Sequence, residues 1–304
     1  MKDLSIIIVS YNTADITVAA IQSVIDTVKK ITCEIIVVDN ASKDESVKKI
    51  NALKNTNKNI TAISVIENKE NFGFSKANNI GVEKSSGRYV LFLNSDTVVH
   101  KETLDGMVEW MDKNPKVGAS TCKVVFPNGK LDDGSHRGFP TPLRSLFHFT
   151  GLAKLFPNSE FFNGYHLGWK NLDKVHEIEA LVGAFMVVRR EAGDEVKWWD
   201  EDYFWYGEDL DFCYVLNEKG WKIYYIPDYS ILHYKGVSGG IKKNTAVVSQ
   251  ASKETKLRAT NARFNAMRIF YKKHYEKKYP QIITQLVFLG IDIKMKMVKR
   301  QMGI

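Results

Sequence analysis

The chain lacks several features that would place it in other classes of protein. Its 304 residues contain no uncharged apolar run of about eighteen, so we expect no membrane-spanning helix. The start of the chain enters an apolar stretch at once and has no small-residue cleavage site, so we expect no signal peptide. Only three cysteines occur, an odd number in separate apolar contexts, which indicates reduced thiols and a cytoplasmic protein.

Repeats and low-complexity tracts are also missing, and so is one glycine motif. No Gly-x-Gly-x-x-Gly follows the first apolar stretch, where Ser10, Tyr11 and Asn12 stand instead. A nucleotide-dependent oxidoreductase on a Rossmann sheet is therefore a weak alternative.

The net charge of +8 is unevenly distributed along the chain. Residues 242–304 contain fifteen Lys or Arg and three acidic residues, so this segment carries +12 and residues 1–241 carry −4. A uniformly basic nucleic-acid-binding protein would not show this division, and we expect no nucleic-acid partner. The basicity belongs to a C-terminal segment.

Strand and helix patterns alternate over the first hundred residues. Apolar runs typical of buried strands lie at 4–9, 34–38 and 89–93, and apolar spacing predicts a helix at 16–30. A strand–helix–strand order implies a right-handed crossover and a parallel sheet. Polar residues follow the strands and should meet at one rim of the sheet; they are Asn12, Asp39 and Asp96.

The remaining elements are expected from the same patterns. Strands are predicted at 60–66, 117–126, 178–189, 221–226 and 231–233, and helices at 44–59, 75–85, 104–114, 209–219, 252–276 and 280–300. Residues 128–176 are rich in Gly, Pro and aromatic residues and are expected to be irregular. A loop of this length inside a domain is usually functional.

The tripeptide Asn94-Ser95-Asp96 is the most informative short feature, because it directly follows the apolar run 89–93. A carboxylate beyond the end of such a strand can hold a divalent cation, and the cation can hold a diphosphate. The alternative is a strand followed by an ordinary Asp-containing turn.

Short motifs occur in a fixed order along the chain, at 5–12, 37–42, 71–79, 94–96, 183–186, 205–212 and 233–236. No single motif is decisive, but the ordered set resembles family 2 glycosyltransferases of the GT-A type over about residues 4–238. The resemblance implies an α/β, GT-A (Rossmann-like) fold, with a mixed, mainly parallel sheet flanked by helices.

The resemblance also implies a metal site that uses Mg²⁺ or Mn²⁺. Asn94-Ser95-Asp96 stands where the family has a DxD motif, so Asp96 alone keeps the carboxylate, and a late histidine, His233, is a second candidate ligand. The alternative for His233 is a core or surface histidine. Lys235, Gly236 and Ser238 resemble a loop that closes over the diphosphate.

By resemblance, Asp209 is the general base and Glu208 helps to bind donor or acceptor. Trp205 and Tyr206 precede this pair and are assigned to the acceptor. The alternative for the two carboxylates is acidic capping of a helix N-terminus.

Nucleoside binding is assigned to the rim residues and one loop. Asp39 can accept the N3–H of the base, a donor that uracil and thymine share, and Tyr11 can stack on the base. The other donor-binding candidates are Ser10, Asn12, Asn71, Gly73, Lys76, Asn94 and Ser95. Lys76 would reach a phosphate, or be a solvated surface charge.

Residues 136–142 resemble a segment of dTDP-rhamnosyltransferases of this family. This favours dTDP-L-rhamnose as donor, inversion at its anomeric carbon, and a polyprenyl-diphosphate-linked saccharide as acceptor in O-antigen or cell-wall polysaccharide synthesis. Arg137 would pair with a phosphate of that acceptor, or be a structural loop arginine. A UDP-sugar donor is the alternative within the same family.

The C-terminal segment combines apolar helical faces with many Lys and Arg residues. This composition suits an anionic membrane surface, and predicts a peripheral protein on the inner face of the cell membrane. The alternatives are packing on the catalytic domain, oligomer formation, or a non-catalytic membrane or nucleic-acid adaptor. We thus expect a catalytic domain at 1–241, with a nucleotide-binding half at 1–100 and an acceptor half at 101–241, and a basic helical segment at 242–304.

Overall fold

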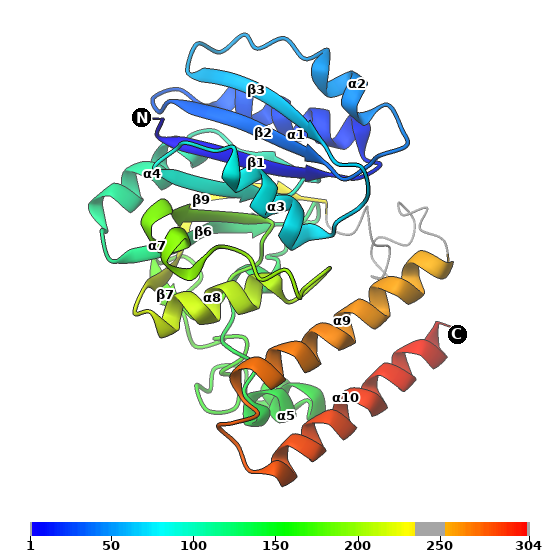
Figure 1. The fold of residues 1–304 in the computed structure, drawn as a ribbon. Helices are drawn as coiled ribbons and strands as arrows, with labels where there is room; N and C mark the ends of the chain where they lie inside the picture. The colour runs from blue at the N-terminus through cyan, green and yellow to red at the C-terminus, as the bar shows by residue number, and fades with distance from the viewer. Residues whose placement is uncertain (1, 235–252, 303–304) are drawn as a thin grey trace.

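A mixed, mainly parallel sheet forms the centre of the molecule in the computed structural model, which describes residues 2–234 and 253–302 (Figure 1). Its strand order is β3-β2-β1-β4-β8-β6-β9-β5, with β7 beside β9. The first four strands pair in parallel and are β1 (Leu4–Ser10), β2 (Cys33–Asp39), β3 (Ile60–Glu67) and β4 (Tyr89–Leu93). The others are β5 (Thr97–Val99), β6 (Val117–Val125), β7 (His176–Ile178), β8 (Phe185–Arg189) and β9 (Lys222–His233). The predicted α/β architecture is confirmed.

Helices cover both faces of this sheet, so its central strands are buried on both sides. One face packs against α1 (Ala14–Thr27) and α4 (Thr103–Lys113), and the other against α3 (Phe74–Glu83), α7 (Arg190–Val196) and α8 (Glu208–Glu218). The short α2 (Ser46–Asn51) contacts α1 and β3. Every residue of β2 and β4 is buried, which explains their continuous apolar runs.

Several predictions of local structure were wrong in part. The expected helix at 44–59 is limited to α2, and the expected strands at 221–226 and 231–233 are the single strand β9. The expected strand at 178–189 is two strands, because Ala180 leaves the sheet and exchanges backbone hydrogen bonds with Arg137. The expected irregular region at 128–176 contains helices α5 (Pro142–Thr150) and α6 (Leu152–Leu155). The signal for α5 is local: the Thr141 hydroxyl caps the helix by accepting from the Arg144 N–H, and Pro142 takes the first turn.

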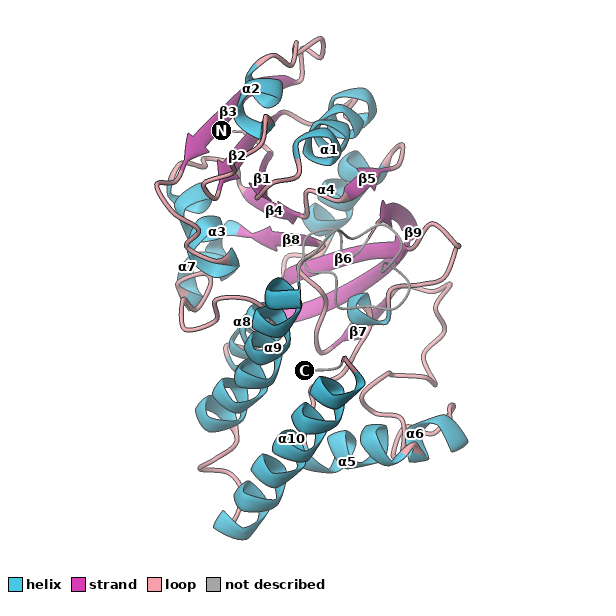
Figure 2. Ribbon diagram, turned by 90° about the vertical axis from the view of Figure 1, so that its right-hand side faces the viewer, coloured by secondary structure: helices cyan, strands magenta, loops and turns pink. Residues whose placement is uncertain are grey.

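Two long helices follow the sheet domain and lie across its end in an antiparallel pair (Figures 1 and 2). They are α9 (Lys253–His274) and α10 (Gln281–Gln301). The apolar face of α9 packs on the sheet domain, where Phe270 contacts Tyr214 of α8 with ring centroids 5.5 Å apart. Within the described residues, no helix has the length and apolarity that a membrane span requires.

Helix α10 packs on α9 and has fewer buried residues. The Tyr271 hydroxyl lies 3.1 Å from that of Thr284, and the Tyr271 and Phe288 rings make an edge contact. Several large apolar side chains of α10 remain exposed. The two C-terminal helices therefore differ: α9 belongs to a core, whereas α10 presents an apolar surface.

Candidate active site

A large cleft runs from the carboxyl ends of the parallel strands to the C-terminal helices. Its volume is about 1560 Å³, and its walls include Tyr11, Asp96, Arg137 and Asp209. Because the first strands are parallel, the residues that follow them meet at one edge of the sheet, as predicted. The cleft continues past this edge between α5, α9 and α10.

The rim after β2 holds a buried carboxylate with one free oxygen. Asp39 is 2% exposed, and its Oδ1 accepts a hydrogen bond from the Ser42 N–H at 2.8 Å. Its Oδ2 has no hydrogen-bond partner among the described residues. A buried oxygen without a partner is costly unless a ligand satisfies it, and a pyrimidine N3–H has the required donor.

Of the residues at the end of β1, one lines the cleft and two make hydrogen bonds within the rim. Tyr11 is exposed and lines the cleft. Ser10 is buried, and its hydroxyl lies 3.2 Å from that of Thr17. Asn12 accepts a hydrogen bond from the Lys43 N–H at 2.7 Å. Ser10 and Asn12 therefore hold the rim in shape, rather than line the cleft.

The loop before α3 is fixed by Asn40, which was not among the predicted site residues. Its side-chain amide donates to the Gly73 carbonyl at 3.0 Å and to Asn71 Oδ1 at 3.2 Å. Gly73 has φ +83°, and a Cβ there would lie 2.5 Å from the Phe204 carbonyl oxygen. Glycine is required here by both conformation and space. Lys76 is exposed over the Phe72 ring, outside the cleft lining.

Asp96 and His233 lie together at the end of β4 and β9. His233 Nε2 is 3.2 Å from Asp96 Oδ1, and on the other side of the ring Nδ1 is 3.3 Å from Asp132 Oδ2. Burial opposes the charged imidazole, but hydrogen bonds to the two carboxylates raise the pKa of His233. Asp132 thus fixes which nitrogen of His233 faces Asp96.

These two donors fit a Mg²⁺ or Mn²⁺ ion whose remaining ligands come from a substrate. Neighbouring ligands of an octahedral ion with bonds of about 2.1 Å lie about 3 Å apart, close to the separation of His233 Nε2 and Asp96 Oδ1. No cluster of three or more His, Cys, Asp or Glu side chains suited to a metal occurs among the described residues. Phosphate oxygens and water would therefore complete the shell. Asn94 and Ser95 line the cleft beside Asp96.

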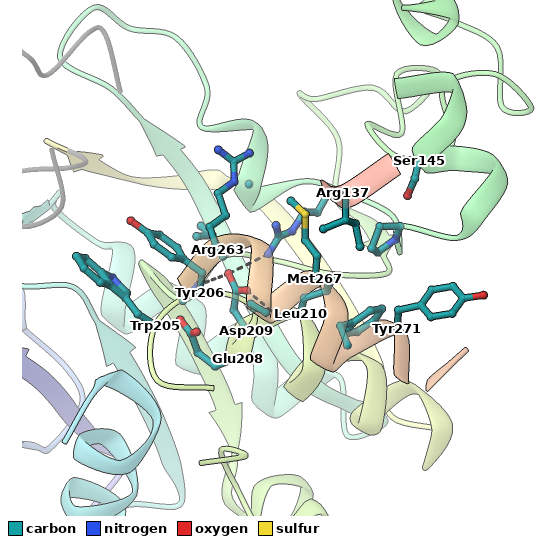
Figure 3. Close-up of a pocket in the computed structure, with 18 of the residues that line it drawn as sticks. Arg137, Ser145, Trp205, Tyr206, Glu208, Asp209, Leu210, Arg263, Met267 and Tyr271 are labelled. Atoms are coloured by element: carbon teal, nitrogen blue, oxygen red, sulfur yellow. Dashed lines mark hydrogen bonds and ion pairs between the residues drawn. The ribbon is translucent and has the colours of Figure 1, made fainter. Parts of the chain in front are cut away.

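The Glu208-Asp209 pair begins α8 after a tight turn in which Tyr206 has φ +73° and Gly207 φ +89°. Asp209 Oδ2 accepts from Arg137 Nη2 at 2.9 Å and from the Gly183 N–H at 3.3 Å (Figure 3). Arg137 is therefore the ion-pair partner of the predicted base, a contact that the sequence did not predict.

Glu208 lies beside this ion pair in a different environment. It is 8% exposed, and its Oε2 has no hydrogen-bond partner within the described part of the chain. Burial and the neighbouring Asp209 charge raise the pKa of Glu208 to about 8. The raised pKa favours the protonated form of Glu208, which can donate a hydrogen bond.

Aromatic and basic side chains complete the wall opposite the strands. Trp205 and Tyr206 stack with ring centroids 5.1 Å apart and an interplanar angle of 7°. Helix α9 adds Arg258, which lies over the Phe204 ring, and Arg263, which lies near Tyr206 (Figure 3).

Besides Asn40, three residues of this site were missed at the level of sequence: Asp132, Arg258 and Arg263. The acidic pair Asp132-Asp133 before Gly134 was the available signal for the first. Nothing in the periodicity of α9 distinguishes its cleft-facing arginines from its solvated ones. The segment 235–238, which was expected to close over a diphosphate, lies outside the described residues.

Comparison with known proteins identifies the family of the chain from its sequence. A family model described as glycosyl transferase family 2 matches residues 5–175, more than half of the chain. Rhamnosyltransferase WbbL of Escherichia coli (strain K12) is 27% identical over 172 residues, covering 54% of this chain and 61% of the relative. An N-acetylglucosaminyl-diphospho-decaprenol L-rhamnosyltransferase of Mycobacterium tuberculosis (strain H37Rv) is 27% identical over 162 residues, covering 50% and 48%. The matches thus span about half to three fifths of the relatives' lengths.

Among solved structures, GalNAc-T7 with UDP, GalNAc and Mn²⁺ superposes with a TM-score of 0.57. The sequences are 16% identical, and the superposition covers 89% of this chain and 50% of that one. At this identity, the likeness concerns the fold alone.

Proposed function

Because the chain belongs to glycosyl transferase family 2, we propose that it is an inverting glycosyltransferase that moves L-rhamnose from dTDP-L-rhamnose onto a lipid-diphosphate-linked saccharide. The carrying observation is that Asp96 and Asp209 line one cleft, and that Asp39, with its unpartnered Oδ2, ends the parallel strand β2 at the same edge of the sheet. Both relatives are named as rhamnosyltransferases, and the name of one contains a diphospho-decaprenol.

In this mechanism, Asp209 accepts the proton of the acceptor hydroxyl while the oxygen attacks the anomeric carbon. Attack comes from the side opposite to the leaving diphosphate, so the configuration inverts. Three donors, the Arg137 guanidinium and the Gly183 and Leu210 N–H groups, hold the Asp209 carboxylate in one orientation. Because the carboxylate is already held in one orientation, the activation barrier does not include the entropy cost of fixing a mobile side chain.

The nucleotide is held by the rim residues. Asp39 Oδ2 accepts from the base, and Tyr11 covers a face of the ring. A Mg²⁺ or Mn²⁺ ion at Asp96 and His233 would supply positive charge against the diphosphate. In its protonated form, Glu208 donates a hydrogen bond to a sugar hydroxyl without placing a second negative charge beside Asp209.

A donor preference is the first test of this proposal. We expect transfer from dTDP-L-rhamnose and little from UDP-sugars, measured by release of the nucleoside diphosphate. Asp39→Asn should weaken binding of dTDP and UDP alike, by roughly tenfold or more, because the amide presents a donor to the shared N3–H. Transfer from UDP-sugars with none from dTDP-rhamnose would contradict the donor and favour the UDP-sugar alternative.

We further propose that the enzyme is cytoplasmic and lies on the inner face of the membrane through the exposed apolar side of α10. Ile282 and Leu289 are 65% and 55% exposed, and Lys296 and Arg300 follow on the same helix. Each cation near an anionic leaflet contributes about 1 kcal/mol to the free energy of membrane binding, and salt screens this contribution. The contribution from burial of apolar side chains is not screened by salt. Apolar side chains with nearby cations are the arrangement that an anionic interface binds.

The expected result is binding to anionic liposomes that weakens, but does not vanish, as salt rises. The double variant Ile282→Glu/Leu289→Glu should lose the liposome binding that persists at high salt. Sedimentation with liposomes measures this binding. Gln285→Glu is the matched control, because it adds the same kind of charge on α10 without removing an apolar group. Point variants are preferred to removal of 252–304, because α9 supplies core residues such as Phe270. Unchanged sedimentation of the double variant would place the membrane contact elsewhere.

A further inference from the structure

The cleft extends beyond the catalytic carboxylates into a groove whose walls are exposed and apolar. Helix α5 contributes Leu143, Leu146 and Phe149, and α10 contributes Leu286, Ile293 and Met297. All six side chains are between 48% and 58% exposed, although they line one cavity. Lys294 of α10 lies over the Phe149 ring at 5.5 Å, so the two helices face one another closely.

Their spacing shows that these are continuous stripes. On α5 the apolar residues recur every three positions, and on α10 they recur every four to seven, so each set lies along one side of its helix. Facing apolar stripes that remain accessible to water are unfavourable unless a ligand covers them. The groove therefore has the chemistry to hold an extended hydrocarbon chain.

Two cations, Arg263 and Lys294, line the same cleft as this groove. The positive charge of Arg263 acts on both Tyr206 and His148, and that of Lys294 acts on His148. Burial, the paired His166 and these cations together lower the pKa of His148 to about 4, so it adds no charge of its own at neutral pH. Both cations line the cleft: Arg263 lies near Tyr206 (Figure 3), and Lys294 lies at the apolar wall over Phe149.

The cleft therefore contains a base, two cations and an apolar groove. We infer that the groove between α5 and α10 binds the prenyl chain of a lipid-diphosphate acceptor, with its diphosphate at Arg263 and Lys294 and its sugar toward Asp209. This inference rests on the proposed function. It adds a chain-binding subsite separate from the outer membrane-facing side of α10, which carries Ile282.

The test is direct binding of geranylgeranyl diphosphate, without donor, by intrinsic fluorescence or calorimetry. Leu146→Glu and Leu286→Glu should each weaken binding by roughly tenfold or more, since each removes apolar contact and adds charge. Ile282→Glu, one turn before Leu286 and outside the cleft lining, should leave this binding unchanged while it weakens liposome binding. These side chains are about half exposed or more, so the variants should fold.

Two further arms identify the head group. Lys294→Gln should weaken the binding of geranylgeranyl diphosphate but leave the binding of geranylgeraniol unchanged. Inorganic diphosphate alone should bind far more weakly than the lipid diphosphate. Slow hydrolysis of the nucleotide sugar by water should persist in Leu146→Glu and Leu286→Glu. If the wild type binds geranylgeranyl diphosphate but does not hydrolyse the nucleotide sugar, the result counts against the proposed function and not against the groove.

The inference is overturned if both groove variants bind geranylgeranyl diphosphate as the wild type does. It is also overturned if Leu286→Glu acts only by dissociating a dimer, seen by light scattering, because the stripe would then be an interface between copies of the chain. If Leu146→Glu and Leu286→Glu lose vesicle binding but bind the lipid diphosphate as the wild type does, the stripes are a membrane-binding surface and not a groove for the prenyl chain.

Discussion

Replacing Asp209 with Asn should lower kcat by roughly 100-fold or more while donor affinity stays close to that of the wild type. Asparagine keeps the size of the side chain, and its amide oxygen can still accept from a backbone N–H, but it cannot take up a proton. Asp209 lies away from the rim residue Asp39, so nucleotide binding should not depend on it. Single-turnover rates and donor binding by calorimetry separate the two quantities.

The ion pair with Arg137 makes a control necessary, because Asp209→Asn also leaves a largely buried guanidinium without its charged partner. Arg137→Gln keeps the carboxylate but removes its partner, and should cost less turnover than Asp209→Asn. Asp211→Asn on the same helix disturbs a buried carboxylate that accepts from Tyr203 and His274 outside the cleft. It should lower thermal stability with little change in kcat of the folded enzyme. Near-normal turnover of Asp209→Asn would remove this residue from the role of base.

Replacing Asp96 with Ala should abolish metal-dependent binding of the nucleotide sugar and reduce turnover below detection. Only His233 would then remain of the two proposed protein ligands, and the diphosphate would lose its charge compensation. Titration of Mn²⁺ by electron paramagnetic resonance reports the metal directly, without turnover. An excess of EDTA should have the same effect on the wild type as the substitution.

Asp132→Asn is the informative companion to this variant. It keeps both proposed ligands, and weakens the contact that orients His233 Nδ1. We expect a loss of metal affinity between 10-fold and 100-fold, smaller than that of Asp96→Ala. Turnover that continues at full rate in excess EDTA would refute the metal assignment altogether.

The strands that position the site were predictable because their burial is complete. The runs at β1, β2 and β4 are apolar on both faces, and the residues after them follow from parallel pairing alone. The three-residue strand β5 was not predicted, because it is too short to show a period. Helix α5 was missed although a Thr-Pro cap marks its start.

The contacts within the site were much less accessible from sequence. Arg137 and Asp209 are 72 positions apart, and the hydrogen bond between Asp132 and His233 spans 101. No local pattern encodes which pairs of charges will meet across such separations. The resemblance to a family assigned a role to Asp209, but its guanidinium partner became visible only in three dimensions.

The packing of α9 has a consequence for how the protein is made. The strands β1 to β4 end at Leu93, whereas the helix that supplies Phe270 and Arg263 begins at Lys253, about 160 residues later. At a synthesis rate of about 5–20 residues per second, the nucleotide rim would leave the ribosome roughly 10–30 s before the helix that completes the cleft. The face of α8 around Tyr214 is made late in that interval and stays uncovered until α9 follows. A nascent chain can therefore acquire nucleotide affinity before it acquires a closed acceptor site, and chaperones would meet it in that state.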